Sequence, residues 1–254
     1  MQKYTIKETF TLPSKGKMYT NLENPSISLR SMTTREEMKR LAPTDTPYKA
    51  MSEIIEECIV GDKPSVGVYN LFIGDYEFLL QKLRVVTYGP EYKMTVQCPY
   101  CGEVTETVTD LDTLETKEFK EEVLELLKVQ LPVSGKSVEL NIQTPRMLDE
   151  IAQDVKDIKK RHKNSYINPE LRVTLQHLIK KVDGNTMMPS ELEMFVLDLP
   201  MKDVTTILNR LKDFNAKVGP GSLLEVKCGQ CGEEFLTTFR YTPEFFGPTE
   251  VEWW

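Results

Sequence analysis

The sequence predicts an α+β fold: a helical N-terminal unit with leading strands, a ribbon of two separate hairpins, and a mainly helical insertion between these hairpins. Three observations lead to this prediction. Two CxxC motifs, each followed by glycine, lie far apart at residues 98–102 and 228–232, and strand-like residues flank both. Between them apolar residues recur at steps of three and four, the spacing of amphipathic helices. The N-terminal residues alternate apolar and polar side chains before the same helical spacing begins.

Residues 1–90 are expected to form the first unit. The alternation over residues 4–12 predicts a strand with one buried face, and residues 27–30 predict a second extended segment. Three helices should follow, and their expected starts are a capping box of Thr34 and Glu37 before a helix from Arg35, Pro47 in the first turn of the next, and Gly74-Asp75 as the N-cap of the third. Cys58 falls on the apolar stripe of the second helix and is expected to be a buried thiol.

The two CxxC motifs predict a metal site. Each motif should form the tip of a hairpin that places two sulfur atoms on the same side of a tight turn, and a zinc ion takes four such ligands in a tetrahedron. The glycine after each second cysteine permits the positive φ that these turns often require. We therefore expect one structural Zn²⁺ per chain, and its predicted ligands are Cys98, Cys101, Cys228 and Cys231.

Other functions of these cysteines fit the sequence less well. Disulfides need an oxidising compartment, and the chain begins without the apolar segment of a secretory signal. A redox CxxC usually occurs once, near a βαβ pattern, whereas here two copies sit in matching hairpins. A catalytic zinc ion keeps one coordination position open and normally has histidine or carboxylate ligands. The metal is therefore expected to hold the fold together.

The position of the CxxC motifs divides the rest of the chain. Strand-like residues lead into and out of each motif, so residues 91–111 and 222–242 should be the two zinc hairpins of one split ribbon. Residues 112–221 form the insertion, whose ends the metal would hold together. Its expected elements are an acidic amphipathic helix at 119–127, a hairpin or strand pair at 133–140, a helix from Pro145, a helix over 171–182, one capped by Ser190, and one over 204–214.

Composition limits the classes of function. The net charge of −7, from 32 basic and 39 acidic residues, argues against a general nucleic-acid-binding protein. The best candidate for phosphate contact is the basic run at 159–163. Basic side chains at a helix C-terminus also interact favourably with the helix dipole, which explains the run without a ligand. No stretch approaches the roughly eighteen apolar residues of a membrane span, so no membrane association is expected.

No motif supports an enzyme. The two histidines, His162 and His177, lie in no metalloprotease motif, and residues 135–137 resemble a phosphate-binding loop that lacks its first glycine, since Gln130 occupies that position. We expect neither catalytic nor cofactor-binding residues.

Both ends of the sequence suit contacts with partners. The C-terminal tail, residues 243–254, is acidic and aromatic, and its stretch from Phe245 to Trp254 contains both tryptophans. It is expected either to fold back over the ribbon or to dock into another subunit. The N-terminal strand could likewise pair with the sheet edge of a partner, although pairing within its own unit is the default.

Two segments carry a resemblance to a known family. "LPSKGKMY" at residues 12–19, followed by "LRSMTTREE" at 29–37, resembles a baseplate hub protein family of T-even-like, contractile-tailed bacteriophages, and the CPYCG hairpin at 98–102 is similar too. The resemblance implies a structural or assembly protein of the baseplate hub, with other baseplate or tail proteins as partners. It implies a location in the tail baseplate of the virion, or in the host cytoplasm during assembly. The alternative from the residues is a zinc-ribbon nucleic-acid-binding regulator or packaging accessory protein.

Overall fold

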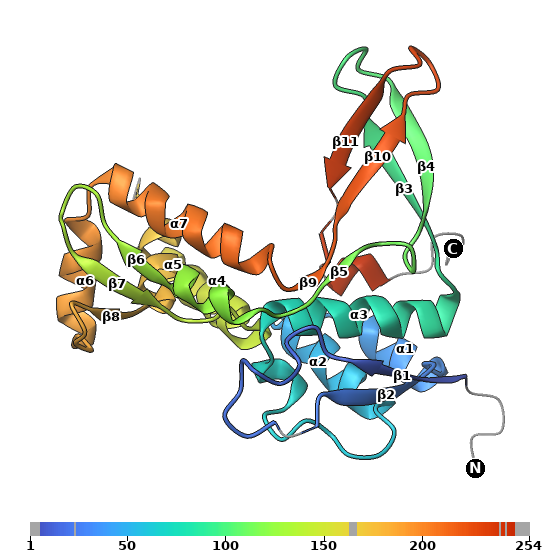
Figure 1. The fold of residues 1–254 in the computed structure, drawn as a ribbon, viewed down its shortest axis with the longest axis horizontal. Coiled ribbons are helices and arrows are strands. Elements are labelled where there is room, and N and C mark those ends of the chain that lie inside the picture. The colour runs from blue at the N-terminus through green and yellow to red at the C-terminus, as the bar shows by residue number, and fades with distance from the viewer. Residues whose placement is uncertain (1–5, 23, 163–166, 239, 242, 247–254) are drawn as a thin grey trace.

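The computed structural model describes residues 6–22, 24–162, 167–238, 240–241 and 243–246. Figure 1 shows its three parts: the N-terminal strands and helices, the two hairpins that project from them, and a group of helices around a small sheet. The mixed fold of helices and strands confirms the predicted class. None of the helices in these described ranges is long and apolar enough to cross a membrane.

The N-terminal unit packs a two-stranded sheet against three helices. Strand β1 pairs antiparallel with β2, and Lys7 lies opposite Arg30. Helix α3 is buried along most of its length between the sheet, α2 and the base of the hairpins. The bounds of these elements are β1 Lys7–Thr11, β2 Ser26–Arg30, α1 Thr34–Arg40, α2 Pro47–Cys58, η1 Val68–Asn70 and α3 Ile73–Tyr88. The predicted buried thiol of Cys58 is confirmed, and burial raises its pKa to about 12.

Helix α1 begins one residue earlier than the sequence predicted. Its N-cap is Thr33, whose hydroxyl accepts from the N–H of Arg35, and the Glu36 carboxylate accepts from the N–H of Thr33 at 2.7 Å. The predicted capping box of Thr34 and Glu37 is therefore wrong by one position. Thr33 with Glu36 and Thr34 with Glu37 both have the spacing of a capping box. Only Glu36 also forms an ion pair with Arg30, which lies outside the helix.

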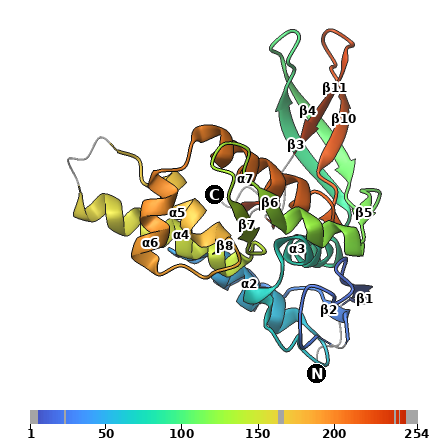
Figure 2. The same cartoon turned by 60° about the vertical axis from the view of Figure 1, so that its left-hand side comes forward.

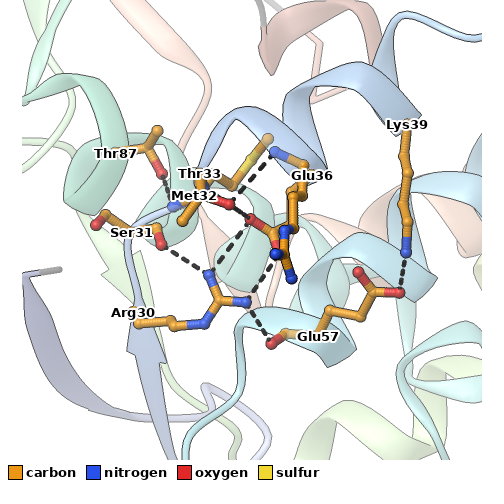
Figure 3. A network of polar contacts seen from close by, with 9 residues as sticks. Arg30, Ser31, Met32, Thr33, Glu36, Lys39, Glu57 and Thr87 are labelled. Carbon is orange, nitrogen blue, oxygen red and sulfur yellow. Dashed lines mark hydrogen bonds and ion pairs between the residues drawn. The ribbon is translucent and has the colours of Figure 1, made fainter. Parts of the chain in front are cut away.

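Arg30 and Glu36 form a buried ion pair that joins β2, α1 and α2 (Figure 3). Arg30 Nη2 lies 2.9 Å from Glu36 Oε1 and also donates to the carbonyl of Glu57 at the end of α2. Burial would raise the pKa of Glu36, but the hydrogen bonds from Arg30 and Thr33 outweigh it and lower the pKa to about 2. The pair therefore stays ionised and fixes the start of α1 against α2.

Helix α3 does not use Gly74-Asp75 as its N-cap, which corrects a second prediction. The helix begins at Ile73, and Asp75 lies inside the first turn, fully buried. Its carboxylate accepts from the N–H of Ser14 at 2.9 Å and from the Tyr19 hydroxyl at 2.6 Å. Tyr19 in turn accepts from the N–H of Phe72. Asp75 thus anchors the loop of residues 12–19 to the start of α3.

The insertion contains a three-stranded sheet, β6-β7-β8, covered by helices. Helices α4 and α7 confirm the predicted helices from Pro145 and over 204–214. The bounds in this region are β5 Thr116–Lys117, η2 Glu121–Leu127, β6 Lys128–Gln130, β7 Ser137–Leu140, α4 Pro145–Arg161, α5 Glu170–Leu178, β8 Ile179–Val182, α6 Pro189–Leu197, α7 Met201–Asn215 and β9 Gly219–Pro220.

Three elements of the insertion differ from expectation. The predicted amphipathic α-helix at 119–127 is instead the short 3-10 helix η2. The strand pair predicted at 133–140 consists of β7 and β6, and β6 lies before residue 133. The predicted helix over 171–182 ends at Leu178 and continues as β8, because β7 offers a free edge on which Val182 pairs with Val138. The apolar spacing of Ile179 and Val182 fits a buried helix face and a sheet equally well.

Helix α6 starts at Pro189, so Ser190 lies inside the helix and does not cap it. The fixed φ of proline suits the first helical position, and the N–H of Met188 donates to the Glu191 carboxylate at 3.0 Å. Glu193, the expected partner of Ser190, instead forms an ion pair with Arg172 of α5.

Two hydrophobic cores lie on either side of α4. The first unites the N-terminal unit, the inner residues of the hairpins and Phe245-Phe246; the second fills the space between the β6-β7-β8 sheet and helices α5 to α7. Leu148 of α4 packs on the first core, whereas Met147 packs on the second. The predicted domain boundaries at residues 90, 111, 221 and 242 remain predictions.

Asp149 of α4 supplies the N-terminal cap that α2 lacks. The N-cap residue of α2, Thr46, makes no side-chain cap, but the buried carboxylate of Asp149 accepts from the N–H groups of Tyr48 and Lys49, and from the Tyr69 hydroxyl. A residue of the insertion thus completes a helix of the N-terminal unit.

Replacing Asp149 with alanine is expected to lower the free energy of unfolding by about 1–3 kcal/mol, because buried donors lose their acceptor. Amide hydrogen exchange of Tyr48 and Lys49 should accelerate. The control is Asp157→Ala on the same helix, since the Asp157 side chain is 56% exposed and should cost little. Equal effects of the two substitutions would contradict this role of Asp149.

Gly74 lies where the backbones of α3 and β9 come into close contact. A Cβ on Gly74 would lie 2.2 Å from the carbonyl oxygen of Val218, and Gly219, with φ of +125°, would meet Gly74 in the same way. Gly74→Ala is therefore expected to destabilise the protein by about 1–3 kcal/mol or more in thermal or denaturant unfolding. Gly229→Ala is the control, because a Cβ there meets nothing within 4 Å; a cost at Gly74 no larger than at Gly229 would refute the steric argument.

Candidate metal centre

The two CxxC motifs lie at the tips of two hairpins, as predicted. Strand β3, Glu91–Gln97, pairs with β4, Val104–Asp110, and β10, Leu223–Lys227, pairs with β11, Glu234–Thr238. Each hairpin is a separate two-stranded sheet. Figures 1 and 2 both show the hairpins side by side, projecting from the body of the molecule. We call these two hairpins together the ribbon.

The two CxxC turns have the same backbone geometry. The N–H of Cys98 donates to the carbonyl of Glu103 at 2.8 Å, and the N–H of Gly102 donates back to the carbonyl of Cys98 at 3.0 Å. In the second turn Cys228, Glu233 and Gly232 make the equivalent bonds, at 2.9 and 3.0 Å. Gly102 has φ of +76° and Gly232 has φ of +75°, so the positive φ expected after each motif is confirmed.

These turns bring the four predicted ligands together. All four Sγ atoms lie within 4.8 Å of one another, with Cys98 Sγ 3.7 Å from Cys231 Sγ and Cys101 Sγ 3.6 Å from Cys228 Sγ. A disulfide would place two Sγ atoms about 2.05 Å apart, so the cysteines are free thiols. Sulfur atoms about 2.3 Å from a central zinc ion in a tetrahedron are separated by about 3.8 Å. The distances between the hairpins therefore fit a tetrahedral metal ion.

The surroundings of the four sulfur atoms are not equivalent. Cys98 and Cys228 are buried, whereas Cys101 and Cys231 are exposed at the tip. Backbone N–H groups of Cys231 and Gln230 donate to Cys228 Sγ and lower the pKa of this thiol to about 6. A backbone hydrogen bond from Glu103 lowers the pKa of Cys101, but burial and the hydrogen bonds with Cys228, Cys231 and Cys98 outweigh it and raise the pKa to about 12. The pKa of Cys231 is raised as well. A metal ion that binds all four sulfur atoms as thiolates would therefore have to displace protons from Cys101 and Cys231.

The ribbon is fixed at its base by an aromatic cluster around Arg84 of α3. The buried guanidinium lies 4.9 Å from the ring centroid of Tyr92 on β3 and 5.8 Å from that of Phe245. Tyr241 follows β11, packs on Phe245 and donates its hydroxyl to the carbonyl of Gly221. Both hairpins are thus tied to α3 at one end, and the cysteines meet at the other.

A family comparison agrees with this architecture. The family model described as T4 bacteriophage base plate protein matches residues 3–247, nearly the whole chain. The chain belongs to this T4 bacteriophage base plate protein family. The membership confirms the resemblance to T-even-like baseplate proteins and gives the protein a structural role in the phage tail baseplate. No curated protein and no solved structure matches the chain.

The C-terminal segment of the base plate protein follows the first of its two predicted courses at Phe245 and Phe246. The 3-10 helix η3, Pro243–Phe246, places Phe245 and Phe246 in the first core, where the ring of Phe245 packs at a tilt against Tyr92 and that of Phe246 packs edge-to-face against Tyr88. These two phenylalanines fold back on their own chain and are not available to a partner, because the core already buries them. Trp253 and Trp254 lie outside the described residues.

The other predicted contact sites of the base plate protein are partly described. Strand β1 pairs with β2 of its own unit, which was the default expectation, and docking through this strand remains a prediction. In the basic run, Lys159, Lys160 and Arg161 end α4 as expected, and Lys163 lies outside the described residues. Lys160 approaches Asp157 at 3.9 Å, a weak exposed pair.

Sequence reasoning missed the residues that hold the ribbon and the insertion to the N-terminal unit. The sequence patterns assigned no partner to Arg84 and Asp149, and they assigned Asp75 to cap its own helix. Their partners lie 61 residues away for Asp75 and 101 for Asp149, so no local pattern announces them. The one available signal was the charge itself, because the apolar surroundings of Asp75 and Arg84 on α3 predict that a buried charge needs a partner.

Proposed function

We propose that this base plate protein is a component of the baseplate hub, or a factor that helps to build it, and that it acts through contacts with other baseplate or tail proteins and without enzymatic activity. The observation that carries the proposal is the family match over residues 3–247. The four-cysteine group supports a structural centre, because four thiolates would leave a metal ion no open position for substrate.

One Zn²⁺ per chain is the metal that this donor set favours. Two thiolates come from each hairpin, so the ion would join residues before the insertion to residues after it. The ribbon would then be held at both ends, by the aromatic cluster at its base and by the metal at its tip. The ribbon would keep one orientation on α3, as a component of a large ordered assembly requires.

The shape of the ribbon supports contacts with other proteins. It projects from the body (Figures 1 and 2) and carries exposed apolar side chains. Val104, Val108, Leu223 and Leu236 are all more than half exposed. Apolar side chains gathered on one projecting element are typical of surfaces that meet a partner.

The test is quantitative mass spectrometry of purified tails and baseplates beside their assembly intermediates. A fixed ratio to other baseplate proteins in mature particles would support a structural subunit, and presence in intermediates alone would support an assembly factor. Absence from both would overturn the proposal and favour the nucleic-acid-binding alternative. That alternative predicts retention on DNA or RNA at low salt, which should fall when Lys159, Lys160 and Arg161 are replaced.

A further inference from the structure

An open apolar groove lies on the insertion, on the opposite side of α4 from the N-terminal unit. Helices α4, α5, α6 and the start of α7 enclose a volume of about 780 Å³. Its floor is apolar and belongs to the second core, with Leu175, Val196, Leu199 and Val204. Leu197 and Met201 stand at the edge with 59% and 64% of their surface exposed. The groove therefore leaves apolar side chains uncovered where two helices diverge.

One edge of this groove is basic. Lys159 and His162 from the end of α4 line it, and Arg161 lines the adjoining hollow. Asp154 also lines that hollow, where its carboxylate contacts His177. Glu193 also faces the groove, but its charge is balanced by the ion pair with Arg172. Lys159 has no ion pair among the residues that the structure describes. A ligand for this surface should hence combine large apolar side chains with negative charge.

The chain itself contains a segment of this chemistry. Residues 247–254, Gly-Pro-Thr-Glu-Val-Glu-Trp-Trp, follow the last described residue and carry both tryptophans of the sequence and two glutamates. The aromatic rings match the apolar floor, and the glutamates match the basic edge. These residues are also the longest stretch of sequence beyond the described part of the chain.

The position of η3 indicates which molecule supplies the segment. Phe246 is fully buried against Tyr88 at the end of α3, so the segment starts beside the ribbon base. Figure 1 shows this end of α3 and helix α6 on opposite sides of the molecule along its longest axis. Eight residues extend at most about 26–29 Å. Helix α3, with 16 residues, is itself about 24 Å long, and α6 lies beyond its other end (Figure 1). The segment would have to cover the whole of α3 and more to reach the groove of its own chain, so a groove on a neighbouring molecule is the natural target.

We propose that the groove between α4, α5, α6 and α7 binds the C-terminal segment, residues 247–254, of a second copy of the chain. In this arrangement the two tryptophan side chains pack on the apolar floor, and the charges of Glu250 and Glu252 complement those of Lys159 and Arg161. Reciprocal exchange of the segments gives a closed dimer, whereas one-way exchange gives a longer oligomer. The inference does not depend on the zinc ion or on the place of the protein in the baseplate.

The experiment uses the full chain and follows two signals together. Sedimentation equilibrium gives the mass relative to the 29.3 kDa monomer, and tryptophan emission reports on residues 253 and 254 alone, because they are the only tryptophans. We expect association at micromolar concentration with blue-shifted emission. On dilution the mass should fall to that of the monomer while the emission moves to the red. A chain ending at Phe246, which keeps the core residues of η3, should stay monomeric.

Substitutions at exposed positions separate the groove from the general stability of the fold. Leu197→Ser combined with Met201→Ser should weaken association by about tenfold or more. The matched control is Met194→Ser on α6, because Met194 is also 59% exposed but does not line the groove, and it should change nothing. Lys159→Glu should weaken association, and adding Glu250→Lys and Glu252→Lys should restore it in part.

Three results would overturn the inference. A monomer with red-shifted emission at every concentration would mean that the segment does not bind. A monomer with blue-shifted emission that Leu197→Ser abolishes would mean that each chain covers its own groove. Association that survives the groove substitutions, or the loss of residues 247–254, would place the contact elsewhere.

Discussion

Replacing Cys98 with serine is expected to release the metal and unfold the ribbon. Cys98 is buried and supplies one of the four clustered sulfur atoms, and its Sγ lies 3.7 Å from Cys231 Sγ of the other hairpin. Structural zinc sites contribute about 10–16 kcal/mol to the folding of small domains. Each hairpin of the ribbon has only two strands, and these strands are short and largely exposed. Such hairpins are marginal without further support, so the effect should be large.

The loss should be local, because the second core contains no residue of the ribbon. Amide hydrogen exchange should show fast exchange in β3, β4, β10 and β11 and near-normal protection in α5 and α7. Zinc content should fall from one ion per chain to none, and a chelator should have the same effect on the unmodified protein. Cys58→Ala is the control: its buried thiol is not one of the four clustered sulfur atoms, so this variant should keep its zinc despite reduced stability.

A Cys98→Ser protein that keeps one zinc ion and full protection in the ribbon would contradict this account. So would loss of zinc from the Cys58→Ala protein.

Replacing Arg30 with methionine is expected to lower the free energy of unfolding by about 3–5 kcal/mol. The substitution leaves the Glu36 carboxylate buried without its cation, because the Glu36 side chain is only 6% exposed. It also leaves the carbonyl of Glu57 without the guanidinium donor that Figure 3 shows. Denaturant unfolding measures the change directly.

Two further variants identify the cause. Adding Glu36→Gln to Arg30→Met should recover much of the loss, because glutamine is neutral and can still accept from the N–H of Thr33. Lys128→Met tests an exposed pair instead: its side chain and that of Glu125 are 66% and 71% exposed, so the cost should stay below about 1 kcal/mol. If Arg30→Met proved no more costly than Lys128→Met, the buried pair would not stabilise the fold as described.

The parts of the fold that the sequence predicts well are those with local patterns. Alternation predicted β1 and the ribbon strands, three-to-four spacing predicted α2, α4 and α7, and proline marked the start of α2 and α4. The four cysteines needed only the matching turns to become neighbours, because each CxxC fixes two sulfur atoms locally. Geometry of this kind transfers from sequence to structure with little dependence on the rest of the chain.

The mistaken predictions share one physical origin. Thr33 caps α1 because Glu36 is drawn to Arg30, and residues 179–182 leave the helix because β7 has a free edge. Asp75 binds a loop 61 residues earlier and does not cap its own helix. In each case the local sequence allows two conformations of nearly equal energy, and a contact with a residue far along the chain stabilises one of them. A sequence pattern describes those conformations but not the contact.

The most direct test of the account is the metal content of the freshly purified chain, measured by native mass spectrometry together with elemental analysis. The account predicts a single species of one Zn²⁺ per chain, with loss of the ion when Cys98, Cys101, Cys228 or Cys231 is replaced and with no disulfide among them. A chain that is fully folded without metal, or whose four cysteines form disulfides, would contradict it.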